Sequence, residues 1–411
     1  MKFMSGKILA LLLAICMLLS LVSCNIIPTN NNQNNDQTGD QTTPPPSEDN
    51  STDVFDLGVF NPTGPIKNVI FIIGDGMGKN HIEAGALDRG SAYDFQSWQR
   101  VDVNTDSIDA ETGELGLTNS SASATALATG VLTHNDLVGV DPDGTPLATI
   151  MDYAKAAGKL TGIVTSDYLY GATPAGFSAH AMDRDDRKTI TESQVLSDIN
   201  FLAGLTSNIY GQTLYKKIIS NSPYYFTETL NDPEIYQKEQ VMLALNIEDD
   251  TDNSVTLAQT TKAALEYLEK DSDGFVLMIE QAYIDKNSHN NQFGGMVDRM
   301  HSLAETVDAV MEWIGDRNDT VVLISADHET GGLTVSKTEE LTFSYNGESG
   351  VFYYAWGTKN HTRSYVSLYV YGTTEKFEEY KTYQDGSIIK NADIFDLLKR
   401  LVTTGEPSPS A

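Results

Sequence analysis

Near-continuous runs of β-branched and aliphatic residues constrain the fold of this chain more than any other feature. Such runs are typical of strands that are covered on both faces, as in a parallel sheet. We predict strands at 68–74, 161–165, 274–279, 320–325 and 365–371. The last run alternates between apolar and polar residues, so we expect it nearer an edge of the sheet.

Segments with helical periodicity separate these runs. They are 146–157, 258–270, 296–315 and 392–402. Strands that alternate with helices predict an α/β fold, in which a large, mostly parallel central sheet is flanked by helices on both faces in three layers. The 411 residues, 40% of them hydrophobic, suffice for a large core in one such domain.

The charge of the chain excludes one class of partner. The formal net charge is −30, from 57 acidic and 27 basic residues. A surface this acidic repels a phosphate backbone, so we expect no nucleic-acid binding. Most of the excess is expected to be solubilising surface, with a few carboxylates neutralised by divalent cations.

The N-terminus has the features of a bacterial lipoprotein signal. Lys2 and Lys7 precede an apolar run at 8–19, which is short for a membrane span, and the run is followed by Leu-Val-Ser-Cys ending at Cys24. This ending resembles a lipobox, so residues 1–23 are predicted to be a signal peptide and Cys24 to be lipidated. An ordinary secretory signal with an incidental cysteine is the alternative.

Residues 24–64 are mostly Asn, Gln, Thr, Pro, Ser and Asp. Such a segment has little to bury and is predicted to be a disordered membrane tether for a folded domain at 65–405. The expected location is therefore extracytoplasmic and membrane-anchored, at the cell surface or in the periplasm. Because cleavage would remove Cys16, the only other cysteine, no disulfide is expected within the monomer.

Two segments place an aspartate close to a histidine just after a predicted strand. The first contains Asp285 and His289, and the second contains Asp327 and His328. In open α/β sheets, functional groups collect at the carboxyl ends of strands. Mixed carboxylate and imidazole ligands suit zinc better than calcium. Either segment alone could be a surface loop with solvated charges, but two together favour a metal site.

Two glycine- or serine-rich segments add to this pattern. A glycine-rich loop at 74–78 follows the first predicted strand, but its spacing is not that of a dinucleotide-binding loop, and Asp75 at its centre would repel phosphate. Asp75 is better interpreted as a metal ligand. Residues 118–130 predict a tightly packed helix that begins near Ser120 and whose first amides favour negative charge, although a plain capped helix has the same pattern.

The acidic run at 248–252 lacks an EF-hand register, so we expect a solvated insertion there.

Taken in motif order, residues 66–400 resemble the alkaline phosphatase family, with its three-layer fold. The family's nucleophile motif matches Asn119-Ser120-Ser121-Ala122-Ser123. The resemblance implies that Ser120 is the catalytic nucleophile of a phosphomonoesterase and forms a phosphoserine intermediate. It further implies that Arg184 clamps the phosphate, with Asn119 beside it in the substrate site.

The resemblance also implies three cation sites, two for zinc and one usually for magnesium. The first zinc site would consist of Asp285, His289 and His361. The second zinc site would consist of Asp75, Asp327 and His328. The magnesium site would consist of Asp75, Thr173 and Glu280.

Two positions depart from the family pattern. Many relatives have aspartate at the position of Asn119, so Arg184 is expected to keep only an amide as its partner. Relatives usually have aspartate or histidine at the position of Gly171, which leaves the identity and affinity of the third ion open. Lys286 would then lack an acidic partner at 171 and turn toward phosphate, and Gly171→Asp would tighten magnesium binding.

The nucleophile motif also bears on competing functions. Sulfatases of this superfamily require proline and arginine where this chain has Ala122 and Ala124, so we do not expect a sulfatase. A phosphodiesterase of the same superfamily is the alternative enzyme, but Ser120, Arg184 and Glu280 favour monoesters. A non-catalytic surface lipoprotein that binds phosphate or metal is the alternative outside enzymes. Because such relatives are often dimers, a homodimer is an expected oligomeric state. The remaining histidines are expected to have no catalytic role: His81, His134, His180 and His301.

Overall fold

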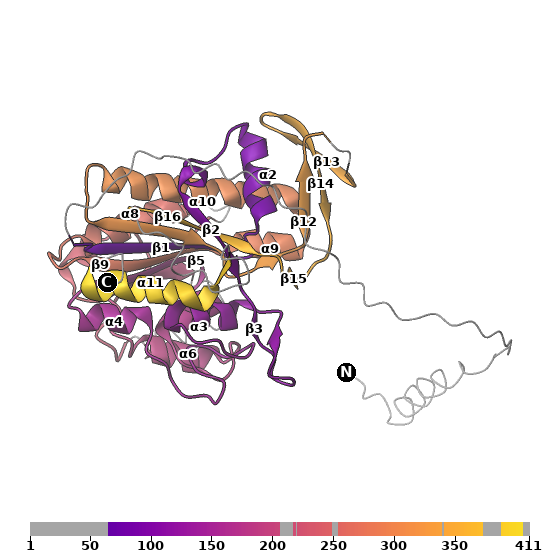
Figure 1. Cartoon of the computed structure of the whole chain (residues 1–411). Coiled ribbons are helices and arrows are strands. Elements are labelled where there is room, and N and C mark those ends of the chain that lie inside the picture. Colours follow the sequence, from indigo (N-terminus) through magenta and orange to yellow (C-terminus); the bar gives the residue numbers. More distant parts are fainter. Residues whose placement is uncertain are drawn as a thin grey trace, which may run out of the picture. The chain divides into compact units, whose positions relative to one another are not determined.

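Figure 1 shows the computed structural model of the chain, which describes residues 65–205, 217–218, 220–248, 254–338, 341–372 and 388–405. The predicted signal peptide, Cys24 and the tether lie outside the described residues, as do residues 249–252 of the acidic run. Among the described helices, none has the length and apolar character needed to span a bilayer.

A ten-stranded sheet forms the centre of the described domain (Figure 1). In spatial order its strands are β17 (Ile388–Lys390), β2 (Gln99–Asn104), β16 (Val366–Tyr371), β10 (Thr320–Ser325), β1 (Asn68–Gly74), β9 (Phe275–Gln281), β5 (Leu160–Tyr168), β6 (Phe201–Leu205), β8 (Val241–Leu245) and β7 (Tyr225–Thr227). Of these ten strands, β16 alone runs antiparallel to both its neighbours, β10 and β2. The prediction of a large, mostly parallel sheet is confirmed.

Helices cover both faces of this sheet, which gives the predicted three layers (Figure 1). One face carries α2 (Lys79–Arg89), α8 (Leu257–Leu268) and the long α10 (Phe293–Ile314). Helix α10 packs against both α2 and α8. The other face carries α3 (Ser120–Thr129), α4 (Ile150–Ala156), α5 (Ala172–Ser178), α6 (Arg187–Gln194) and α11 (Asn391–Thr404). Since the central strand β1 is covered on both sides, all seven of its residues are buried, which explains its uninterrupted apolar sequence.

Three strands between 201 and 245 were not predicted. Strands β6, β8 and β7 extend the sheet to one of its edges, and all residues of β6 and β8 are buried. Each of these strands is five residues or shorter, too short to give a clear periodic pattern.

Three smaller sheets were also not predicted. They are β12 (Leu333–Ser336) with β14 (Gly350–Trp356) and β13 (Phe343–Gly347), β11 (Glu329–Thr330) with β15 (His361–Thr362), and β3 (Ser107–Ile108) with β4 (Leu115–Gly116).

The register of the three central strands brings polar side chains together at one edge. In the parallel ladders, Ile73 of β1 lies opposite Ser325 of β10 on one side and Glu280 of β9 on the other. Asp75 lies two residues after Ile73 in the chain, and Asp327 lies two residues after Ser325. The carboxylates of Asp75 and Asp327 therefore lie at the end of the sheet where Glu280 also lies. Functional groups in open α/β sheets collect at this carboxyl end of the strands.

Candidate active site

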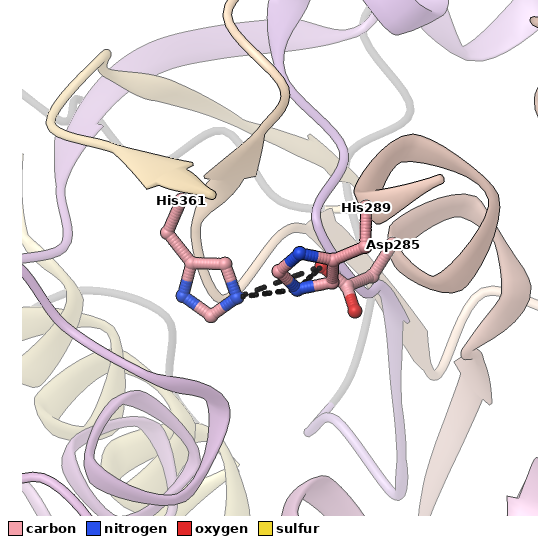
Figure 2. Close-up of side chains that lie close together, drawn as sticks. All are labelled: Asp285, His289 and His361. Atoms are coloured by element: carbon pink, nitrogen blue, oxygen red, sulfur yellow. Dashed lines mark hydrogen bonds and ion pairs between the residues drawn. The ribbon is translucent and has the colours of Figure 1, made fainter. Parts of the chain in front are cut away.

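Asp285, His289 and His361, the first trio, converge on one point (Figure 2). Asp285 and His289 lie one turn apart on α9 (Tyr283–His289), and His361 begins β15. Asp285 Oδ1 is 3.3 Å from His289 Nε2 and 3.6 Å from His361 Nε2, and the two Nε2 atoms are 3.1 Å apart. Ligands held about 2.0–2.2 Å from a tetrahedral zinc ion are about 3.3–3.6 Å from each other. The first trio therefore has the spacing of a metal site.

Hydrogen bonds fix which nitrogen each imidazole presents. His289 Nδ1 is 2.5 Å from the Lys359 carbonyl oxygen, and His361 Nδ1 is 2.9 Å from the Thr118 carbonyl oxygen. A carbonyl only accepts, so both Nδ1 atoms carry the proton and both Nε2 atoms keep a free lone pair. Burial lowers the pKa of His361, which also favours the neutral, ligating form.

Asp75, Asp327 and His328, the second trio, are all buried. His328 Nε2 is 3.3 Å from Asp327 Oδ2 and 3.6 Å from Asp75 Oδ1. Neither carboxylate oxygen has a hydrogen-bond partner within the described part of the chain. Burial raises the pKa of both carboxyls, and it raises that of Asp327 to about 7. For Asp75, the negative charge of Asp327 raises the pKa further. Unpaired buried carboxylates are costly, and a cation between them removes that cost.

Thr330 connects the two trios. Its hydroxyl donates to Asp285 Oδ1 at 2.6 Å, so it must accept from His328 Nδ1, which lies at 3.2 Å. The proton on Nδ1 leaves Nε2 of His328 free to bind a metal. Thr330 also pairs with His361 across the β11–β15 ladder. Thr330 stands inside the Asp327-to-Gly332 motif, but sequence reasoning gave it no role.

Ser120 lies beside the second trio. It is the first residue of α3, and the Asn119 side chain caps the helix by accepting from the Ala122 amide at 3.1 Å. Ser120 Oγ is 3.2 Å from His328 Nε2, the nitrogen that faces both carboxylates of the second trio. The ten-residue helix directs its first amides toward the same place, where they favour negative charge.

Arg184 lies near both trios. Burial lowers the pKa of His328 and His361, and the positive charge of Arg184 lowers both further. The backbone amide of Arg184 donates to the Asp136 carbonyl at 2.8 Å, and the Asn119 amide nitrogen donates to Asp136 Oδ1 at 2.8 Å. Asp136 was not anticipated from the sequence. It links the two predicted substrate-binding residues where Asn119 replaces the family's aspartate.

A family model described as alkaline phosphatase matches residues 66–214 and 238–396, most of the chain. The chain belongs to the alkaline phosphatase family. It is 29% identical to alkaline phosphatase 3 of Bacillus subtilis over 290 residues, which is 66% of this chain and 62% of that relative. It is 27% identical to alkaline phosphatase of Escherichia coli over 383 residues, 75% of this chain and 81% of the relative. The chain thus spans somewhat less than two thirds of the Bacillus protein.

Solved alkaline phosphatases have the same fold. The enzyme from the Antarctic bacterium TAB5 superposes with a TM-score of 0.70 at 24% identity, covering 83% of this chain and 98% of that one. The Thermus thermophilus enzyme gives 0.68 at 18% identity, covering 84% and 93%. The predictions of family and fold are therefore confirmed, whereas the lipoprotein form stays a prediction.

The third ligand set expected for the alkaline phosphatase family also lies at this edge of the sheet. Glu280 is buried, accepts from the Thr165 hydroxyl, and has its pKa raised to about 8 by burial and by the charge of Asp167. Thr173, in the first turn of α5, has a buried hydroxyl without a hydrogen-bond partner among the described residues. Asp75 Oδ1 likewise has no hydrogen-bond partner among the described residues. These oxygens fit a hard divalent cation.

Lys286 does not behave as the family comparison led us to expect. It was predicted to lack an acidic partner at 171 and therefore to turn toward phosphate, but its Nζ lies 2.5 Å from Oδ1 of another acid, Asp167. A Cβ placed on Gly171 would be 2.9 Å from Asp167 Oδ2 and 2.9 Å from the Tyr168 carbonyl oxygen. An aspartate at 171 would therefore be crowded and would face a like charge. The expectation that Gly171→Asp tightens magnesium binding does not hold for this geometry.

Glu248 corrects a second expectation, that the acidic run is solvated. Its carboxylate is 5% exposed and accepts from Arg299 at 2.7 Å, from the Gln281 amide at 2.9 Å and from the Ser302 hydroxyl. Gln281 directly follows the predicted ligand Glu280, so Glu248 ties the chain just after β8 to the end of β9. An acid-rich sequence alone does not distinguish this anchor from a solvated residue.

The four remaining histidines each have a partner outside the two trios. His81 Nε2 lies 3.1 Å from Ser288 Oγ, and His134 and His180 lie against the carbonyls of Ile108 and Gly139. His301 joins Asp88 at 2.8 Å and the Tyr93 hydroxyl at 3.1 Å.

Proposed function

We propose that this protein hydrolyses phosphate monoesters through a phosphoserine on Ser120, at a site that holds two zinc ions and one magnesium ion. The observation that carries the proposal is the position of Ser120 Oγ, 3.2 Å from His328 Nε2 and thus beside the second trio. Family membership supports the same reaction class.

The donor atoms of each site fit the proposed ions. The first and second trios combine carboxylate and imidazole, which zinc accepts in tetrahedral geometry. The third set offers oxygens only, from Asp75, Thr173 and Glu280, as magnesium prefers. A variant of the TAB5 alkaline phosphatase is described with Mg bound in its M3 site, which supports a magnesium site in this family.

The chain's own groups divide the work of the first step. Ser120 releases its hydroxyl proton to solvent, Oγ attacks phosphorus in line, an Oγ–P bond forms, and the bond from phosphorus to the alcohol oxygen breaks. The fork of Arg184 can hold two phosphoryl oxygens, and the first amides of α3 face the same charge. When bound, the zinc ions supply charge that stabilises the serine alkoxide and the departing oxygen.

The second step restores the enzyme. Water attacks the phosphoserine, the Oγ–P bond breaks, and Ser120 regains its proton as orthophosphate leaves. The departing alcohol has by then taken a proton from solvent, so atoms and charge balance over the cycle. Arg184 serves both steps, because phosphorus carries its charged oxygens throughout.

Three further features are proposed on the sequence alone. Cys24 is lipidated after removal of residues 1–23, the enzyme is held outside the cytoplasm by its tether, and two copies form a homodimer. A phosphodiesterase of the same superfamily and a non-catalytic binding protein remain the competing functions, and one experiment distinguishes all three.

The test compares the wild type with Ser120→Ala on p-nitrophenyl phosphate and on bis-p-nitrophenyl phosphate, with zinc and magnesium supplied. We expect the monoester to be the better substrate of the wild type and the variant to lose at least about 1,000-fold in kcat. Ser197→Ala is the matched control, because its hydroxyl donates to the backbone carbonyl of Gln194 and belongs to neither trio. Faster diester cleavage would favour the diesterase, and equal rates for wild type and Ser120→Ala would favour the binding protein.

A further inference from the structure

Lys286 is held by two neighbours on the side of the third cation site. Its ammonium lies 2.5 Å from Asp167 Oδ1 and 4.4 Å from the centre of the Tyr283 ring. The Asp167 side chain is 16% exposed and that of Lys286 37%. A charge pair of this kind, with one member largely buried and an aromatic face beneath the cation, is better defined than an ordinary surface ion pair.

Asp167 occupies the space that a side chain at position 171 would need. The backbone of Gly171, with φ −55° and ψ 154°, would accept any residue, so conformation is not what requires glycine here. A Cβ on Gly171 would instead come within 2.9 Å of Asp167 Oδ2. The carboxylate of Asp167, near the end of β5, thus fills the place opposite the N-terminus of α5.

Asp167 is also connected to a predicted ligand of the third site. Its amide donates to Thr165 Oγ1 at 2.8 Å, and the Thr165 hydroxyl donates to Glu280. Thr165 and Glu280 lie opposite each other in the β5–β9 ladder. The negative charge of Asp167 acts on Glu280, and the positive charge of Lys286 acts on both Glu280 and Asp75. The charge pair therefore lies next to the third ligand set.

We propose that Asp167 is a positioning residue of the third cation site, which takes over the role of the acidic side chain absent at Gly171. Asp167 restrains Lys286 and keeps its positive charge from the phosphate and the third cation. It also adds negative charge beside Asp75, Thr173 and Glu280, where a divalent cation that prefers oxygen ligands would bind. The inference deepens the proposed function and rests on it, because the third cation is part of that proposal.

The proposal is tested by calorimetric titration of the zinc-loaded protein with magnesium and, separately, with inorganic phosphate. Asp167→Asn keeps the shape of the side chain and removes its charge. We expect its magnesium affinity to fall at least about 10-fold, the usual consequence of losing a residue that supports metal ligands. Phosphate should bind several-fold more tightly, because the charge of Lys286 is released. Asp167→Glu should restore the magnesium affinity to near that of the wild type.

Lys286→Met provides the second arm. On its own it should leave magnesium affinity unchanged or higher, and in its background Asp167→Asn should no longer tighten phosphate binding. The proposal is overturned if folded Asp167→Asn binds magnesium and phosphate as the wild type does. If Asp167→Asn does not fold, a 10-fold loss of magnesium affinity in Lys286→Met overturns it instead.

Because both titrations are made without turnover, the two proposals fail separately. A wild type that hydrolyses no monoester but binds magnesium in a way that depends on Asp167 would refute the function and keep this inference. A wild type that hydrolyses monoesters, with magnesium affinity indifferent to Asp167, would do the reverse.

Discussion

Replacing Thr330 by valine removes one hydroxyl that serves both trios while keeping nearly the same volume. In the wild type this hydroxyl donates to Asp285 Oδ1 at 2.6 Å and accepts from His328 Nδ1 at 3.2 Å. Valine would leave a ligand of the first trio without its donor and a ligand of the second without its orienting partner. We therefore expect both predicted zinc sites to weaken together.

The size of the effect follows from these two contacts. The bond to Asp285 is short and charge-assisted, so its loss costs about 1.5–3 kcal/mol. The longer bond to His328 contributes less. Losing a group that orients metal ligands typically weakens metal binding by about 10–100-fold, which corresponds to about 1.4–2.7 kcal/mol. The two routes agree, and we expect zinc affinity to fall within that range.

The assay is competition for zinc with a chromophoric chelator, made on the wild type, Thr330→Val and Thr330→Ser. Serine keeps the hydroxyl and loses only a methyl group, so its zinc affinity should stay close to that of the wild type. Wild-type affinity in Thr330→Val would refute the reasoning. Equal weakening in both variants would show that packing of the methyl group matters rather than the hydrogen bonds.

Two predictions concern stability. Above the ordinary pKa of histidine, the raised pKa of Glu280, about 8, and of Asp327, about 7, means that the metal-free fold holds protons on carboxyls that the unfolded chain has lost. The Tm of the chelated protein should therefore fall as pH rises from 7 to 8, and a Tm that rises instead would contradict this. Glu248→Ala leaves Arg299 without its carboxylate and should lower the free energy of unfolding by about 3 kcal/mol in denaturant titrations. The exposed Glu192→Ala is its control, and equal losses would refute the anchoring role.

The parts of the fold that sequence predicted well are those buried on both faces. Strands β1 and β10 have the predicted bounds, because every residue in them is covered and none needs to be polar. Strand β2 was missed because only Val101 and Val103 of its six residues are buried, and Gln99, Arg100 and Asp102 are polar. Strand β17 was missed because it has only three residues. Short or polar edge strands acquire their structure from their neighbours rather than from their own pattern.

The candidate site shows the same limit. Motif order indicated which residues gather at the strand ends, because Asp75, Asp285 and Asp327 each follow a recognisable apolar run. It gave no role to Asp167, which reaches Lys286 only because β5 lies beside β9 in space. Nor did it indicate Asp136, whose partners Asn119 and Arg184 come from different segments. A residue whose role depends on contacts with other segments cannot be recognised from its neighbours along the chain.

The order in which the chain is synthesised separates the members of the two trios. Asp75 leaves the ribosome long before His361, which is carried by the short β15. A nascent chain therefore cannot assemble the first trio until β15 can pair with β11. Under the proposed function, a cation that needs all three side chains of the first trio can bind only after β15 has been made and paired.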